Sequence, residues 1–132
     1  MKAYLAIKFH KDCKNRKLIE DISESMESAG IKSTVIIRDY ENWCSKEYSP
    51  DELMKLTFKI IDESEIVVVE FSENSIGAGI EAGYGYANKK PIIVIAKQGS
   101  EIPTTIRGIA TKLIFYEKPE ELTKEFERIK KH

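Results

Sequence analysis

Apolar residues fall into short runs that predict five strands. Residues 3–7, 66–69 and 91–95 are continuously apolar, which is typical of central parallel strands that helices cover on both faces. Residues 33–37 are rich in β-branched side chains and predict another strand, and residues 113–116 predict the last one. Together these runs supply the strands of one sheet.

Helical patterns separate these strands. In residues 17–29, apolar side chains recur at a spacing of four, which lines one face of a helix. Residues 49–52 read Ser-Pro-Asp-Glu, which gives a helix start with a serine N-cap, a proline at the first helical position and a capping-box glutamate. Two further helices are predicted, one over about 77–88 and one that opens at residue 119.

The alternation of strands and helices predicts the fold class. Such a pattern gives a parallel sheet with right-handed crossovers, so we expect an α/β fold. Residues 1–132 should form a single-domain, doubly wound, Rossmann- or flavodoxin-like sheet of five parallel strands with helices on both faces. Ligands bind such sheets beyond the carboxyl ends of the strands, near the point where strand order reverses. The segments 8–14, 72–79 and 97–107 occupy that edge.

Charge and composition narrow the class of partner. The net charge is -1, with acidic and basic residues interspersed, which argues against a broad nucleic-acid surface and favours a small polar ligand. The apolar run at the N-terminus is too short for a signal peptide or a membrane span, so we expect a cytoplasmic protein that binds no membrane. Cys13 and Cys44 have neither CxxC spacing nor a nearby His cluster, so we expect two reduced thiols and no metal site.

The glycine-rich stretch that follows the third strand is the leading candidate for chemistry. Ser75, Gly77 and Gly79 lie where a strand turns into a helix, and glycines together with the free N–H groups of a helix start favour a bound anion such as a phosphate. The alternative is that these glycines serve packing alone. Glu81 follows within two turns, on a helix of small residues where a carboxylate would be buried, which is costly without a partner or a function. The alternative for Glu81 is an ordinary helix-start glutamate.

These residues resemble a known family. The motif Ser-Ile-Gly-Ala-Gly-Ile-Glu-Ala-Gly-Tyr at residues 75–84, then Lys-Pro-Ile at 90–92 and Ile-Arg-Gly at 106–108, is similar to the core of the nucleoside 2-deoxyribosyltransferase family, and most of all to its 2'-deoxynucleoside 5'-phosphate N-hydrolase branch. The resemblance is strong over residues 64–110. It implies hydrolysis of the N-glycosidic bond of a (2'-deoxy)nucleoside 5'-monophosphate, with no cofactor, in a homodimer or higher homo-oligomer.

The resemblance also implies roles for individual residues. Glu81 takes the place of the family's nucleophile, which attacks C1' of the sugar and forms a glycosyl-enzyme ester. Tyr4 matches a tyrosine beside that nucleophile. Ser75, with the backbone N–H groups near Gly77 and Gly79, would bind the 5'-phosphate. Two other activities stay open: base exchange, in which an acceptor base rather than water resolves the ester, and nucleotide sensing without catalysis.

The sequence departs from the family pattern at the residue that assists proton transfer to the leaving base. The family usually carries an aspartate there, and this chain has Thr57. Asp62, Glu70 or Glu73 could substitute, and nothing in the sequence selects among them. This departure motivates the sensing alternative.

Other positions of the binding site also differ from the family. A loop with Lys8 and His10 replaces a small turn after the first strand; it could hold phosphate or block the pocket, and we expect His10 to be exposed. Thr104 or Thr105 stands for a serine that reaches the phosphate of the neighbouring subunit. The planar guanidinium of Arg107 suits a phosphate, with a salt bridge as the alternative.

Two aromatic side chains lie in the polar connection after the second strand. Trp43 and Tyr48 could stack on a base as part of a lid, or they could anchor that loop by hydrophobic contact.

Overall fold

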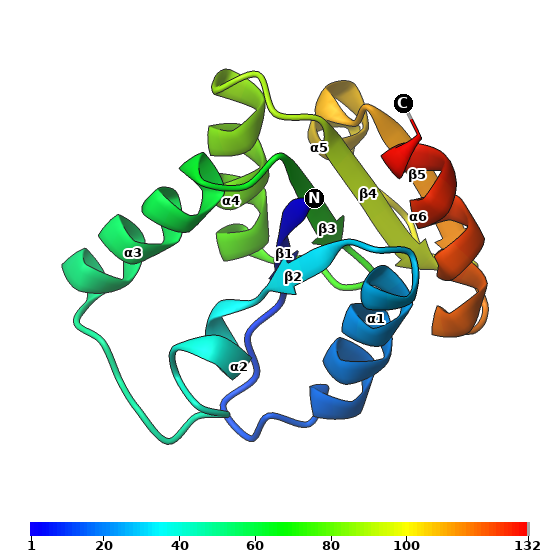
Figure 1. Cartoon of the computed structure of the whole chain (residues 1–132). Coiled ribbons are helices and arrows are strands. Elements are labelled where there is room, and N and C mark those ends of the chain that lie inside the picture. The colour runs from blue at the N-terminus through cyan, green and yellow to red at the C-terminus, as the bar shows by residue number, and fades with distance from the viewer. Residues whose placement is uncertain (132) are drawn as a thin grey trace.

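A computed structural model describes residues 1–131. Five parallel strands form one sheet in the order β2-β1-β3-β4-β5 (Figure 1), so the predicted fold class is confirmed. The strands are β1 (Lys2–Ile7), β2 (Lys32–Thr34), β3 (Ile66–Glu70), β4 (Ile92–Lys97) and β5 (Lys112–Tyr116). The helices are α1 (Arg16–Ser28), α2 (Ile36–Asp39), α3 (Pro50–Asp62), α4 (Ile76–Ala87), α5 (Thr104–Ile109), the 3-10 turn η1 (Pro119–Glu121) and α6 (Leu122–Lys130).

The strand order places the switch point of the sheet between β1 and β3. The chain runs outward from β1 to β2 and then returns to the other side of β1, where β3 pairs with it from Ala3↔Ile66 to Ile7↔Glu70. The carboxyl ends of β1 and β3 therefore lie side by side. The loops that follow them lead to opposite faces of the sheet, and a crevice opens where they diverge.

Two hydrophobic layers explain why residues 66–69 of β3 are continuously apolar. Ile66 and Val68 of β3 pack toward α1 and α6, whereas Val67 and Val69 of the same strand pack toward α3, α4 and α5. Figure 1 shows α1 and α6 on one side of the sheet and α3 and α4 on the other. Because both faces of β3 are covered, the alternation expected of a half-exposed strand is absent.

The second strand is shorter than predicted. The strand expected over 33–37 ends at Thr34, and Ile36 and Ile37 lie in the short helix α2. Asp39 accepts a hydrogen bond from the Val35 N–H at 2.9 Å, and this side-chain contact fixes a turn where β propensity alone favours a strand. The predicted helix start at residue 49 is confirmed, with both hydrogen bonds of the capping box present.

The expectation of two reduced thiols is wrong. Cys13, in the β1–α1 loop, and Cys44, after α2, are joined by a disulfide with their Cα atoms 6.7 Å apart. The two residues are 31 positions apart in sequence, and only the folded arrangement brings the loops together, so their spacing contained no signal of the pairing. Among residues 1–131, no helix is both long enough and apolar enough to cross a membrane.

Candidate active site

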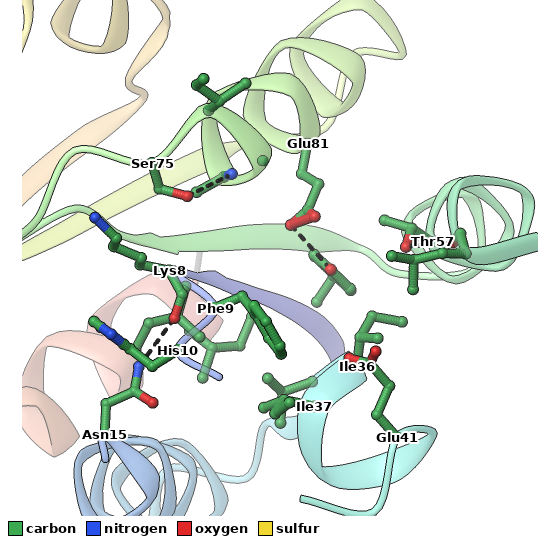
Figure 2. A pocket seen from close by; sticks show the side chains of 18 of the residues that line it. Lys8, Phe9, His10, Asn15, Ile36, Ile37, Glu41, Thr57, Ser75 and Glu81 are labelled. Carbon is green, nitrogen blue, oxygen red and sulfur yellow. Dashed lines mark hydrogen bonds between the residues drawn. The ribbon is translucent and has the colours of Figure 1, made fainter. Parts of the chain in front are cut away.

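A cavity of about 540 Å³ lies at the switch point. Its walls come from the end of β1 and the loop after it, from α2 and α3, and from the first two turns of α4 (Figure 2). Five of the residues predicted for the site line it: Tyr4, Lys8, Ser75, Gly77 and Glu81. The pocket is therefore open, and the loop with Lys8 and His10 forms part of its wall without blocking it.

Glu81 and Tyr4 form a hydrogen-bonded pair inside this cavity. The Tyr4 hydroxyl donates to Glu81 Oε1 over 3.0 Å, from a tyrosine that is only 2 % exposed. Burial raises the pKa of the Glu81 carboxyl to about 7, and the hydrogen bond from Tyr4 acts in the opposite direction. Burial, followed by the charge of Glu81, raises the pKa of Tyr4 well above its usual value. Glu81 therefore changes charge near neutral pH, while Tyr4 keeps its proton.

Ser75 and the first turn of α4 form one wall of the pocket. The Ser75 hydroxyl caps the helix by accepting a hydrogen bond from the Ala78 N–H at 3.1 Å, and the first N–H groups of a helix have no partner within it. A Cβ atom added at Gly77 or Gly79 would contact nothing within 4 Å. Packing therefore does not require glycine at either position. This argues against the alternative that the two glycines serve packing alone.

The loop after β1 adds cationic and aromatic groups. In Figure 2 the Lys8 side chain extends toward the side of the pocket where Ser75 lies. His10 is not the exposed residue that we expected: its side chain is 11 % exposed and its Nε2 lies 2.8 Å from Glu73 Oε2. Phe9, which the sequence analysis did not single out, is 54 % exposed and lines the pocket.

Three predicted phosphate-binding residues lie outside the walls of this pocket. Gly79 is on α4, and Thr104 and Arg107 are exposed on α5. Arg107 Nη2 donates to Thr104 Oγ1 over 3.4 Å, so these two side chains contact each other. The described chain does not bring them to Glu81, and their role stays a prediction.

The sequence and the fold are similar to those of known proteins. No family model matches the sequence. The chain is 27% identical over 112 residues to "Putative 2'-deoxynucleoside 5'-phosphate N-hydrolase 1" of Thermofilum pendens, a match that covers 83% of this chain and 78% of that protein. The resemblance to the nucleoside 2-deoxyribosyltransferase family is confirmed.

Two solved structures of a glycosidase and a transferase share the fold of this chain. A CMP N-glycosidase of Clostridium botulinum is 24% identical, with a TM-score of 0.72 and coverage of 98% of this chain and 99% of that one. A 2-deoxyribosyltransferase of Bacillus psychrosaccharolyticus is 18% identical, with a TM-score of 0.73 and coverage of 93% and 90%. At these identities the two structures establish the common fold of deoxyribosyltransferase-like proteins.

Thr57 remains the clearest departure from the deoxyribosyltransferase pattern. It is 1 % exposed and lines the pocket, and its hydroxyl donates to the Leu53 carbonyl over 2.7 Å. The three substitutes considered from sequence do not line the pocket. Asp62 accepts from the Tyr84 hydroxyl at 2.8 Å, Glu70 accepts from Ser72 and Tyr116, and Glu73 pairs with His10.

Glu41 is an ionisable pocket residue that sequence reasoning missed. It follows α2 and lines the cavity, which makes it the second carboxyl group in the pocket besides Glu81 among residues 1–131. The polar connection that contains it carries no periodicity or motif, so no sequence signal marked it. The aromatic residues of that connection do not line the pocket: Trp43 packs against the core with the Arg16 guanidinium 4.5 Å from its ring centroid, and Lys46 lies over the Tyr48 ring.

Proposed function

We propose that this protein is an N-glycosidase that hydrolyses a nucleoside 5'-monophosphate, ribo or 2'-deoxy, to free base and sugar 5-phosphate, with Glu81 as the nucleophile. The observation that carries the proposal is the Glu81 carboxyl, held by Tyr4 at 3.0 Å, inside a cavity of about 540 Å³ that also contains the N-terminus of α4. That volume is in the range of small-ligand sites. The similarity to a protein named as an N-hydrolase and to a CMP N-glycosidase supports the same reaction.

The chemistry follows from the state of Glu81. With a pKa of about 7, a large fraction of the carboxyl is ionised at neutral pH and can stabilise positive charge that develops on the sugar. The carboxylate then bonds to C1' as the bond from C1' to the base nitrogen breaks. Tyr4 orients the attacking carboxylate through its hydrogen bond and holds its own proton throughout.

The opposite end of the pocket suits the 5'-phosphate. The N-terminus of the 12-residue helix α4 offers free N–H groups near Gly77 and the positive end of the helix dipole. Ser75 can still donate its own hydroxyl proton, because the hydrogen bond with Ala78 uses it only as an acceptor. Lys8 adds a cation on the same side. These groups would separate nucleotides from unphosphorylated nucleosides.

An apolar face on α4 supports assembly as a homodimer. Ile76 is 86 % exposed and Ile80 is 50 % exposed, one turn apart on the same face of the helix. Burial of these side chains by a second copy would bring surface next to the start of α4, and Thr104 and Arg107 on the neighbouring α5 could then reach a phosphate in the partner's pocket. Light scattering of the wild type and of Ile80→Asp would test this: a monomeric wild type would contradict it.

The reaction is tested by a chromatographic assay for free base. Wild type, Glu81→Gln and the matched control Glu24→Gln, which changes an exposed carboxylate on α1, are incubated with ribo- and deoxyribonucleoside 5'-monophosphates and with the parent nucleosides. We expect base release from a monophosphate by wild type and control, and at least a 1000-fold loss in Glu81→Gln, as nucleophile removal typically gives.

Other outcomes identify the rival functions. Formation of a new nucleoside when an acceptor base is added, with little release in water alone, would indicate base exchange. Tight binding of a nucleotide by all three proteins with no base release would refute the glycosidase proposal and support nucleotide sensing.

A further inference from the structure

We infer that Glu41 is the proton donor to the leaving base, a catalytic role that rests on the glycosidase reaction proposed above. Glu41 is half-buried and lines the same cavity as Glu81. In Figure 2 its side chain points from the end of α2 into the pocket, toward the side where Thr57 and Glu81 lie. The two carboxyl groups come from different walls, so a sugar attacked by one could present its base to the other.

The backbone around Glu41 holds it in this position. Its N–H donates to the Ile36 carbonyl over 3.0 Å, and its own carbonyl accepts from the Ser45 and Lys46 N–H groups, each at 3.0 Å. Three residues further on, Cys44 is joined by the disulfide to the loop after β1. Glu41 is therefore fixed at both of its backbone groups, and the segment that carries it is tied to another wall of the pocket.

The Glu41 carboxyl is also free to react. Within residues 1–131 its carboxyl oxygens have no hydrogen bond or ion pair, in contrast to Asp62, Glu70 and Glu73, whose carboxylates are all engaged. Thr57 cannot supply the proton, because its hydroxyl is weakly acidic and already donates to a backbone carbonyl. Glu41 is thus the available acid on this side of the pocket.

Burial and one neighbouring carboxylate favour the protonated form of Glu41. Burial and the charge of Glu47 raise the pKa of the Glu41 carboxyl. Tyr4 faces it from β1 and Glu81 lies across the pocket on α4, and the loop after β1 contributes the Lys8 ammonium and the His10 imidazole to the same pocket. The residues that α3 contributes to the pocket, Leu53, Met54 and Thr57, are uncharged.

The proposed steps conserve protons and electron pairs. As Glu81 bonds to C1', the pair of the C1'–N bond moves to the base, and the Glu41 carboxyl transfers its proton to that base. Water then attacks C1' and displaces the Glu81 carboxylate, while the Glu41 carboxylate takes the proton that water loses. The products are neutral base and sugar phosphate, and both glutamates return to their starting states.

A comparison of two leaving groups tests this role. Wild type, Glu41→Gln and the control Glu24→Gln are assayed with the nucleotide identified above and with the 4-nitrophenyl glycoside of the same sugar 5-phosphate, whose nitrophenolate departs without a proton. Loss of a general acid typically costs about 100- to 10,000-fold. We expect Glu41→Gln to lose that much kcat/KM on the nucleotide and less than about threefold on the nitrophenyl compound.

A pH profile gives an independent measurement on the nucleotide alone. In the wild type, kcat/KM should fall at high pH as the donor loses its proton, and Glu41→Gln should lack that fall. Equal losses on both substrates, unchanged nucleotide turnover, or an unchanged high-pH limb would each overturn the role of Glu41. Base release that depends on Glu81 would still stand in those cases, so this inference can fail while the proposed function survives.

Discussion

Replacement of Glu81 by glutamine should stabilise the fold at alkaline pH and leave it nearly unchanged at acid pH. In the native state, burial raises the pKa of this carboxyl from its usual 4.5 to about 7. Between these two values the native state binds more protons than the unfolded state does. The free energy of unfolding of the wild type must therefore decrease as the pH rises through this range. Glutamine has no such ionisation and carries no such penalty.

The size of this effect follows from the two pKa values. At about 1.4 kcal/mol per pKa unit, the difference between 4.5 and about 7 corresponds to about 3 kcal/mol. This is an upper value, because Glu81 is only half-buried and water in the pocket screens part of its charge. The penalty should be complete above pH 8 and absent below pH 4.5. It amounts to a large fraction of the stability of a domain of this size.

Urea denaturation of both proteins at several pH values from 4.5 to 8.5 measures the effect directly. The quantity of interest is the difference in unfolding free energy between Glu81→Gln and wild type, because other titrating groups contribute equally to both proteins and cancel. We expect this difference to increase by up to about 3 kcal/mol from the lowest to the highest pH. A difference that is the same at all pH values would refute the claim that partial burial raises the pKa of Glu81.

Three further perturbations probe other parts of the structure. Tyr4→Phe removes a hydrogen bond to the Glu81 carboxylate, and such a bond to a charged group is worth about 1.5–3 kcal/mol. A carbon-13 NMR titration should therefore find the pKa of the Glu81 carboxyl about 1–2 units higher, and an unchanged pKa would contradict the contact. Gly85→Ala places a Cβ 2.8 Å from Val67 Cγ2 and should lower the free energy of unfolding, measured by urea denaturation, by about 1–3 kcal/mol. The control Gly83→Ala, whose added Cβ contacts nothing within 4 Å, should instead raise it by up to about 1 kcal/mol. Cys13→Ser opens the disulfide and should lower the unfolding free energy by about 3–4 kcal/mol, and a reductant should destabilise the wild type to the same level while leaving the variant unaffected.

The parts of the fold that the sequence predicted are those in which one local rule decides the outcome. Runs of apolar residues located β3 and β4, because burial on both faces favours apolar side chains along most of each strand. The Ser49 cap located the start of α3 because its hydrogen bonds lie within four residues. The glycine-rich turn before Glu81 located one wall of the pocket, because the hydrogen bond that caps α4 there also joins residues close in sequence, Ser75 and Ala78.

The features that were missed depend on contacts between distant segments. The strand over 33–37 is shorter than predicted because two side-chain hydrogen bonds override β propensity there: Asp39 accepts from the Val35 N–H, and Arg38 donates to the Ser33 carbonyl. Glu41 enters the pocket only because α2 turns back toward β1 and α3. Cys13 and Cys44 meet only when two loops are folded against each other. None of these contacts could be predicted from a periodicity or motif in the sequence.

The disulfide has a mechanical consequence for access to the pocket. It links the segment after β1, which supplies Lys8 and Phe9, to the segment after α2, which supplies Glu41. These two segments are therefore covalently joined, and both contribute to the wall of the cavity. Neither can move outward without pulling the other, so the Lys8 and Glu41 side chains must approach or leave the cavity together.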